Sequence, residues 1–513
     1  MTNPFIDQHQ DKITGTLSCF DRVVITGTLP DICHPSAMGG YLSYHQIRLF
    51  DYAHWAEPRR EEIRVNAEQL AAEAGIQIEF IRKSKAFRKE DRIQQILAAR
   101  GDHPGLVHIF SAMETCASFQ PWHDKSTHHT SLKSTTGKCL HYYFYCIDEA
   151  FGLCYVRVPT WAPFRLQIYF NGHSWLARQL MAADIPFTMA DNALIAIADA
   201  PRAQELADAL DGQQLQVRLD QWARRYVPVL RQFRSGYHWS LMQVEYATDV
   251  VFRQQAHFQP LYDAIVRTAV HVIKASDVAM FLGHKLHGRF AGELGNDFST
   301  RIQGTRIRHH MGPASIKLYD KAGMIARVEC TTNDVAFFKH HRYVEQRNGE
   351  RIFKLAPLRK SIYSLKDLRQ LMQAANDRYY AFMACISNPD ADQKALAKMA
   401  APAKINGRSF RGFDLFLDPD YRLCLTLARG EWSISGFRAR DLRQSITGLT
   451  TGRASYLIKR LRTHGLIKKV SHAYKYFFTK FGRRVVITAL AIREYFVQPS
   501  LLSVAADLKL AEI

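Results

Sequence analysis

Two carboxylates near a predicted β-turn are the residues of this sequence best suited to act on a phosphodiester. Segments 304–321 and 325–331 have the pattern of three short strands joined by tight turns. We expect Asp320 and Glu329 to approach one another where the second and third strands meet. Carboxylates hold Mg²⁺ or Mn²⁺, and cations beside them hold phosphate, so the pair predicts a metal site. The basic side chains expected nearby are Lys317, Arg327 and His310.

The order of these residues resembles the catalytic region of rolling-circle replication initiators of plasmids and filamentous phages. The shared features are a glycine before a strand, then Tyr-Asp-Lys, a turn and Arg-Val-Glu, over about 30 residues. The resemblance implies that Asp320 and Glu329 bind metal and that Tyr343, with Tyr363 as second choice, attacks the DNA backbone. The sequence departs from that family because it has no clear His-hydrophobic-His pair. A structural hairpin whose Asp-Lys pair only forms the turn is the alternative.

A third candidate metal ligand, Asp148, ends the first of three closely spaced predicted strands. These strands cover 141–148, 154–158 and 164–170, and a helix is predicted to follow them. The order resembles the opening of ribonuclease H-like nucleases and transposases, in which the aspartate binds a divalent metal. The alternative is an aspartate that ends its strand in a turn.

A second pair of acids, Glu245 and Asp249, is four residues apart in a segment that we expect to be helical, 243–252. That spacing would place both carboxylates on one face of a helix, where they could share a metal. The alternative is the polar face of an amphipathic helix.

The elements around these acids predict an α+β protein. Strands are expected at 20–29 and 106–110 with helices between them, which is typical of an α/β layer. The predicted regions are an N-terminal α/β region (1–118), a central mixed α+β domain with the candidate catalytic residues (138–345), a helical connector (355–403) and a C-terminal domain (415–498).

The C-terminal domain has the pattern of a helix-turn-helix followed by a hairpin. Helices are predicted at 438–446 and from Thr450 to Gly465, and the second has an apolar stripe at the i, i+3, i+4, i+7 spacing. Strands are predicted at 466–470 and 474–479. This arrangement resembles the winged helix-turn-helix domains of MarR-type and ArsR-type regulators. The resemblance covers about a tenth of the chain.

Basic side chains dominate this winged-helix segment. Between Arg429 and Arg484 the only acids are Glu431 and Asp441. A basic helix followed by a basic hairpin suits a major groove and its flanking phosphates. The alternative is a solvated basic face on a winged helix that binds another protein. The side chains predicted to contact DNA are Arg453, Tyr456, Lys459, Arg460, Arg462, Lys475, Lys480 and Arg483.

Composition points to a polyanionic partner. The 513 residues carry a formal net charge of +20, with a pI near 9.5, which favours nucleic acid over a membrane. No apolar run is long enough to span a bilayer and the N-terminus lacks the order of a signal peptide, so we expect a cytoplasmic protein. The nine cysteines are scattered without a Cys-x-x-Cys pair, so neither a zinc ribbon nor a disulfide framework is predicted.

Three classes of function remain open. The first is a mobile-element enzyme, a transposase or replication initiator that nicks or transfers DNA strands with Mg²⁺ or Mn²⁺. The second is a non-catalytic, MarR-like transcriptional regulator, and the third is a protein that binds a structured RNA. The length exceeds what a small winged-helix repressor needs, and the acids beside cations favour the endonuclease. A homodimer is compatible with each class.

Overall fold

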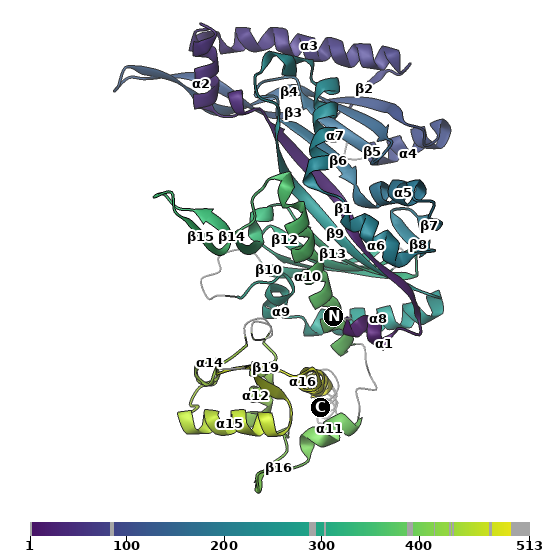
Figure 1. Ribbon diagram of the computed structural model, residues 1–513, viewed down its shortest axis with the longest axis vertical. Helices are drawn as coiled ribbons and strands as arrows, with labels where there is room; N and C mark the ends of the chain where they lie inside the picture. The colour runs from purple at the N-terminus through teal and green to yellow at the C-terminus, as the bar shows by residue number, and fades with distance from the viewer. Residues whose placement is uncertain are drawn as a thin grey trace, which may run out of the picture. The chain divides into compact units, whose positions relative to one another are not determined.

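The computed structural model describes residues 3–82, 87–286, 294–301, 304–386, 393–414, 416–429, 432, 436–470 and 474–493. The chain divides into two compact units. Unit 1 comprises Met1–Gly15, Asp249–Cys330 and Met372–Ile513, and unit 2 comprises Thr16–Thr248 and Thr331–Leu371. Figure 1 labels many of the helices and strands of both.

Helices and strands follow one another along the whole chain. The first elements are α1 (Pro4–Gln8), β1 (Ile13–Thr28), η1 (Pro30–Ile32), α2 (Pro35–Tyr44), η2 (Leu49–Asp51), α3 (Tyr52–Glu73), β2 (Ile78–Phe80), α4 (Lys89–Arg100), β3 (Gly105–Asp124), β4 (His129–Asp148), β5 (Gly152–Pro159) and β6 (Leu166–Asn171). The middle elements are α5 (Gly172–Ala182), β7 (Phe187–Ala190), β8 (Ala193–Ile197), α6 (Ala200–Asp208), α7 (Gly212–Tyr226), η3 (Pro228–Gln232), β9 (His238–Phe252), α8 (Gln255–Val272) and α9 (Ala275–Phe281).

The remaining elements include both hairpins and helices. Strands β10 to β13 are Leu294–Arg301, Gly304–Met311, Ala314–Lys321 and Ile325–Thr332. They are followed by η4 (Val335–Phe337), β14 (Lys339–Glu345), β15 (Arg351–Pro357), η5 (Ile362–Ser364), α10 (Leu365–Ile386), α11 (Gln393–Ala400), β16 (Ala403–Ile405) and β17 (Arg408–Phe410). The last elements are α12 (Asp418–Leu427), α14 (Ala439–Ser445), α15 (Thr451–Thr463), β18 (Ile467–Val470), β19 (Lys475–Phe478) and α16 (Lys480–Ala491).

The main sheet has eleven strands in the order β10-β11-β12-β13-β9-β1-β6-β5-β4-β3-β2. The pairs β3–β4, β4–β5, β5–β6, β1–β6 and β10–β11 are antiparallel, whereas β2 is parallel to β3. Strands β1, β9 and β13 each contribute residues to both units. The mixture of helices and mainly antiparallel strands confirms the α+β class.

In unit 2, residues 141–148 of β4 are buried on both faces. Tyr143 and Tyr145 belong to one apolar cluster with Ile93 of α4. Phe144, between them in the sequence, stacks on Tyr226 of α7 with 4.6 Å between the ring centroids. Since successive residues of a strand point to opposite faces, α4 and α7 cover opposite sides of the sheet here. This is why residues 141–148 are a continuous apolar and aromatic run.

The C-terminal part of unit 1 has its own apolar core, to which Leu423 of α12, Leu461 of α15 and Val486 of α16 each contribute a fully buried side chain. Glycine is required where α16 meets the segment before β18, because a Cβ on Gly482 would lie 1.9 Å from the carbonyl oxygen of Leu466. Three helices therefore pack around one core beside the β18–β19 hairpin.

Several predicted elements are confirmed. The predicted strands at 20–29, 141–148 and 154–158 lie almost entirely within β1, β4 and β5, and the predicted pair of C-terminal helices corresponds to α14 and α15. The predicted strands at 466–470 and 474–479 correspond to β18 and β19. No helix in the described part of the chain is long and apolar enough to span a membrane.

One predicted helix is wrong. Residues 243–252 lie in β9, where every one of them is buried or half-buried. A strand buried on both faces lacks the clean alternation of an exposed strand, and its apolar run cannot be told from a buried helix by periodicity. Glu245 and Asp249 are still on one face, but because they are an even number of residues apart in a strand.

Candidate metal centre and candidate nucleic-acid interface

Three carboxylates from neighbouring strands converge. Asp21 lies on β1, Glu245 on β9 and Glu329 on β13, and these strands are adjacent in the order β13-β9-β1. One oxygen of each lies within 4.8 Å of one oxygen of the other two. In the described part of the chain, this is the one group of three or more His, Cys, Asp or Glu side chains with such spacing. We call it the carboxylate cluster.

Asp21 is held in place by amide groups. The residue is 5% exposed. Asn171 Nδ2 donates to Asp21 Oδ1 at 2.6 Å, and Asn192 Nδ2 donates to the same oxygen at 3.0 Å. Asn171 also caps α5, because its Oδ1 accepts from the backbone N–H groups of His173 and Ser174. One asparagine therefore fixes both the start of a helix and the orientation of the carboxylate.

Glu329 is held from β12. Lys317 Nζ donates to Glu329 Oε1 at 2.6 Å, and the Tyr319 hydroxyl donates to Oε2 at 2.7 Å. Lys317 and Tyr319 are two residues apart in a strand, so both side chains point to the face that carries Glu329. The predicted proximity of Lys317 to Glu329 is confirmed, and this ion pair is almost entirely buried.

The carboxylate cluster suits a small divalent cation. Its ligands are hard oxygen atoms, the type that Mg²⁺ and Mn²⁺ prefer. Two oxygens on opposite sides of one Mg²⁺ lie about 4.2 Å apart, since each bond is 2.0–2.1 Å. The observed limit of 4.8 Å is close to that span, so small side-chain rotations would bring the three oxygens onto one ion. The backbones of paired strands limit larger movements.

Two predicted metal ligands do not join this cluster. Asp320 accepts from the backbone N–H of Gly323 at 2.9 Å, and burial raises its pKa to about 6. Because Asp320 follows Tyr319 in β12, the two side chains point to opposite faces of the strand. The expectation that Asp320 and Glu329 approach one another is therefore wrong, and Asp320 instead fixes the turn before β13.

Asp148 is also a turn residue. Its Oδ1 accepts from the backbone N–H groups of Ala150 and Phe151 at 2.9 and 3.1 Å. Arg218 Nη1 lies 3.4 Å from its other oxygen. The turn alternative describes Asp148 correctly, because its carboxylate replaces the backbone acceptors that the β4–β5 connection lacks.

Arg327 and Asp249 form a buried ion pair. Nε and Nη2 of Arg327 each donate to one oxygen of Asp249 at 2.7 Å, and Arg327 is 0% exposed. A guanidinium that is shielded from solvent and donates through two of its nitrogens to a carboxylate is not available to bind a phosphate. The predicted phosphate-holding role of Arg327 and the metal-sharing role of Asp249 are both replaced by this structural pair.

The predicted nucleophile lies on a separate hairpin. Tyr343 is on β14, is 60% exposed, and its ring lies 5.2 Å from that of Phe353 on β15. Tyr363 is 58% exposed, and its hydroxyl donates to Gln216. Both tyrosines are accessible to a large substrate, and neither belongs to the carboxylate cluster.

Helix α15 presents a basic face beside a buried one. Thr450 caps its N-terminus by accepting from the N–H of Arg453 at 3.3 Å. The predicted stripe is confirmed, because Ala454, Leu457, Ile458 and Leu461 are buried. Arg453, Tyr456, Lys459 and Arg462 are exposed, as predicted. The guanidinium of Arg453 lies 5.4 Å from the centre of the Tyr456 ring, so these two side chains form one continuous surface.

Arg460 was expected on that surface, and this expectation is wrong. Its side chain is 0% exposed and lies over the Phe413 ring at 3.8 Å. Its Nη1 and Nη2 donate to Oδ1 and Oδ2 of Asp420, both at 2.7 Å. A fully paired, buried guanidinium joins α15 to α12 and is unavailable to DNA.

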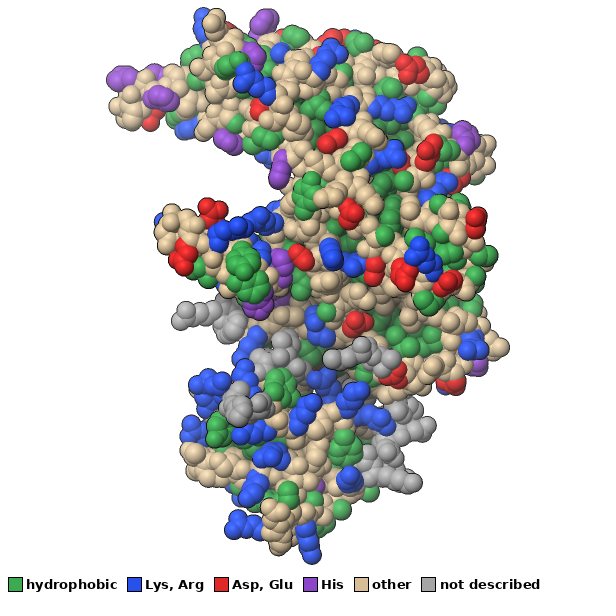
Figure 2. Space-filling model, in the orientation of Figure 1, with side chains coloured by type: hydrophobic (Ala, Val, Ile, Leu, Met, Phe, Trp, Pro, Cys, Tyr) green, Lys and Arg blue, Asp and Glu red, His purple; other side chains and the backbone are tan. Residues whose placement is uncertain are grey.

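The hairpin and α16 extend the basic surface. Lys480 is exposed at the start of α16, and Lys475 and Arg483 are half-buried. Lys469 Nζ lies 4.0 Å from the centre of the Tyr474 ring near the hairpin tip. Figure 2 shows Lys and Arg side chains crowded over the segment that carries α12, α14, α15 and α16, with few acidic ones among them.

Two features of these candidate sites were missed in the sequence. Asp21 is the only acid in β1, and an acid inside an apolar strand is the signal that could have identified it. Phe437 forms an isolated antiparallel bridge with Tyr476, which adds a third short extended segment to the β18–β19 hairpin. The left-handed Gly436 before it, with φ of 64°, marks the turn into that bridge.

Comparison of the chain with protein-family models, curated proteins and solved structures gives no match. The residues themselves therefore carry the functional argument.

Proposed function

We propose that this chain is a DNA-binding protein of the mobile-element type that nicks or transfers DNA strands with a divalent cation. The observation that carries the proposal is the carboxylate cluster of Asp21, Glu245 and Glu329. Placing three carboxylates together without a cation is unfavourable in free energy, because like charges at this distance repel. A charge of +20 on the whole chain provides the attraction to a polyanion.

We further propose that residues 415–498 form a winged helix-turn-helix that recognises the DNA. The order α14, α15, β18, β19 and α16 supports this proposal, as does the exposure of basic side chains on α15. In this role α15 enters the major groove, and the hairpin and Lys480 contact the flanking phosphates. The resemblance to MarR-type and ArsR-type domains agrees with this arrangement.

In the proposed reaction, Asp21, Glu245 and Glu329 hold Mg²⁺ or Mn²⁺. A bound cation of this kind neutralises charge on the phosphate and lowers the pKa of bound water. Asn171 and Asn192 orient Asp21, while Lys317 and Tyr319 orient Glu329. We retain Tyr343 as the nucleophile that the replication-initiator resemblance implies.

The test uses full-length protein and end-labelled single- and double-stranded DNA, with Mg²⁺, with Mn²⁺ and with chelator. We expect nicks that require metal and that disappear in Asp21→Asn and Glu245→Gln. Asp148→Asn is the matched control, because that carboxylate caps a turn and should leave nicking intact. Label that stays on the protein in a denaturing gel, and is lost in Tyr343→Phe, would identify the nucleophile. Intact DNA in every lane would remove the catalytic proposal.

A non-catalytic DNA-binding protein is the second candidate. The observation that favours it is the set of hydrogen bonds to Asp21 and Glu329, since amides and the Lys317 ammonium already satisfy several carboxylate oxygens. In that case the cluster stabilises the sheet, and Asp21→Asn would lower protein stability without a metal-dependent effect. Tight binding with no cleavage would select this candidate.

A further inference from the structure

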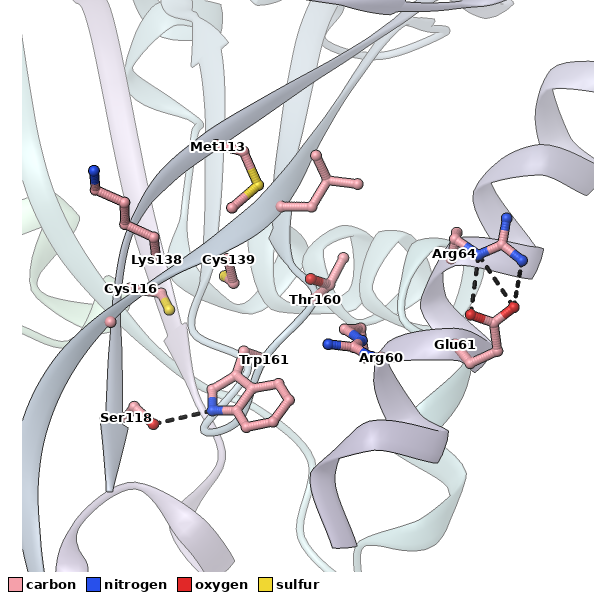
Figure 3. A pocket seen from close by; sticks show the side chains of 12 residues that line it. Arg60, Glu61, Arg64, Met113, Cys116, Ser118, Lys138, Cys139, Thr160 and Trp161 are labelled. Atoms are coloured by element: carbon pink, nitrogen blue, oxygen red, sulfur yellow. Dashed lines mark hydrogen bonds and ion pairs between the residues drawn. The ribbon is translucent and has the colours of Figure 1, made fainter. Parts of the chain in front are cut away.

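Unit 2 contains a cavity of about 530 Å³ between α3 and the β3–β4 hairpin. This volume lies within the roughly 300–1,000 Å³ typical of ligand cavities. Arg60 and Arg64 of α3 line it on one side, and Cys116 and Cys139 line it on the other. Figure 3 shows the Arg60 side chain extending from the helix toward Trp161, which follows β5 in the chain.

The two arginines differ in their pairing. Arg64 forms ion pairs with Glu61 and with Glu68, the latter at 2.5 Å. No carboxylate in the described part of the chain pairs with Arg60. Its guanidinium carbon lies 5.9 Å from the centre of the Trp161 ring. Arg60 therefore brings to the cavity a solvent-exposed guanidinium that is in no ion pair, beside an aromatic face, although its charge is felt by Glu61.

Trp161 is held in one orientation. Its Nε1 donates to the Ser118 hydroxyl at 3.0 Å, and its ring lies 6.2 Å from the buried Tyr52 ring. A fixed indole is a suitable platform for a flat aromatic ligand, because little side-chain freedom is lost on stacking.

Thr160 provides an independent sign that the cavity takes a polar ligand. The residue is 1% exposed and lines the cavity, yet its hydroxyl has no hydrogen-bond partner among the described residues. Its backbone N–H donates to the carbonyl of Leu140 at 3.0 Å, so the amide is satisfied whereas the hydroxyl is not. Buried hydroxyls in native proteins almost always have a partner, so a ligand atom is the expected one here.

We propose that this cavity binds a nucleoside 5′-monophosphate group, with the phosphate on Arg60, the base on Trp161 and a polar atom of the nucleotide on the Thr160 hydroxyl. Arginine and a phosphate oxygen form a strong charge-assisted pair, and a base stacks on indole irrespective of sequence. The same group occurs in a free nucleotide and at the 5′-phosphorylated end of a DNA strand. The site makes no use of the carboxylate cluster and does not depend on cleavage.

The experiment is isothermal titration of the full-length protein with deoxyadenosine 5′-monophosphate and with deoxyadenosine. We expect the nucleotide to bind, and the nucleoside to bind at least about tenfold more weakly, because it lacks the charged partner of Arg60. Arg60→Gln and Trp161→Leu should each weaken nucleotide binding about tenfold or more, and Thr160→Val about fivefold. Arg202→Gln, a change at an exposed arginine of α6, is the control and should leave the affinity unchanged. Far-ultraviolet circular dichroism checks that each variant is folded.

Two further binding measurements distinguish a free nucleotide from the end of a DNA strand as the ligand. A hexanucleotide with a 5′-phosphate that binds more tightly than the mononucleotide would identify a strand end, whereas preference for the mononucleotide would identify a free nucleotide. Asp21→Asn should bind both the mononucleotide and the hexanucleotide as the unaltered protein does. A negative result for metal binding would therefore not contradict nucleotide binding at this cavity. The proposal is overturned if neither ligand binds, or if Arg60→Gln and Trp161→Leu bind as tightly as the unaltered protein.

Discussion

Arg460 and Asp420 form a buried, two-pronged ion pair, in which Nη1 and Nη2 lie 2.7 Å from Oδ1 and Oδ2. Arg460 also donates to the backbone carbonyls of Arg411 and Gly412, at 3.1 and 2.5 Å. The pair thus ties α15 both to α12 and to the segment that precedes it. Other arginines of α15 are exposed on its opposite face, whereas Arg460 holds the helix in place.

Removal of this pair should destabilise the C-terminal core. Arg460→Ala leaves the Asp420 carboxylate buried without its partner, which we expect to lower the free energy of unfolding by about 3–5 kcal/mol. Amide hydrogen exchange of α12 and α15 measures the effect locally. Arg462→Ala, at an exposed neighbour, should change stability by less than about 0.5 kcal/mol. Equal protection in the two variants would contradict the structural role of Arg460.

Exposed cations of α15 should contribute to DNA affinity through phosphates. Arg453→Ala and Lys459→Ala should each weaken DNA binding and reduce the slope of log K against log salt concentration by about one. Fluorescence anisotropy with labelled duplex DNA at several salt concentrations measures both quantities. Lys366→Ala, at an exposed lysine of α10, serves as the control. An unchanged slope in both α15 variants would exclude this helix from the interface.

Metal affinity should depend on the carboxylate cluster even in the absence of DNA. Asp21→Asn and Glu245→Gln keep the side-chain shape but remove a charged ligand, so each should weaken Mn²⁺ binding by at least about tenfold. Electron paramagnetic resonance of free Mn²⁺ in a titration gives the affinity directly. Asp320→Asn should bind Mn²⁺ normally, because its carboxylate accepts a turn hydrogen bond instead. Normal binding by Asp21→Asn would show that the cluster is structural.

His309 should make stability depend on pH. Burial and the neighbouring His310 lower the pKa of His309 to about 3, and its ring contacts Asn296 Oδ1 at 2.6 Å and the Tyr379 hydroxyl at 3.0 Å. The unfolded chain takes up this proton near pH 6.5, whereas the folded chain does not until about pH 3. The stabilisation is therefore complete above pH 6.5 and is lost as the pH falls from 6.5 toward 3.

The comparison of His309→Gln with the unaltered protein isolates this effect from other histidines. Between pH 6 and 4 the unaltered protein should lose up to about 1.4 kcal/mol more per pH unit than the variant. Urea unfolding at each pH provides the measurement. Parallel pH profiles of the two proteins would show that His309 has an ordinary pKa.

The sequence determined those features that depend on neighbours along the chain. The apolar stripe of α15 and its Thr450 cap follow from helix geometry, and the predicted exposures of Arg453 and Lys459 were correct for the same reason. The spacing of apolar residues and turn signals also predicted the strands β4, β5, β18 and β19. It failed for residues 243–252, predicted as a helix, because this segment belongs to β9. A strand that is buried on both faces carries no alternation of apolar and polar residues to distinguish it from a buried helix.

Only the tertiary structure decided which acids meet. Strand order placed Asp21 beside Glu245 and Glu329, while strand alternation directed Asp320 away from Glu329. Arg460 and Arg462 have the same chemistry and are two residues apart, yet one is buried and the other is exposed. That difference depends on Asp420, which α12 brings to one side of α15. Local periodicity gives the face of a helix or strand, but the partner on that face comes from sheet order and packing between distant segments.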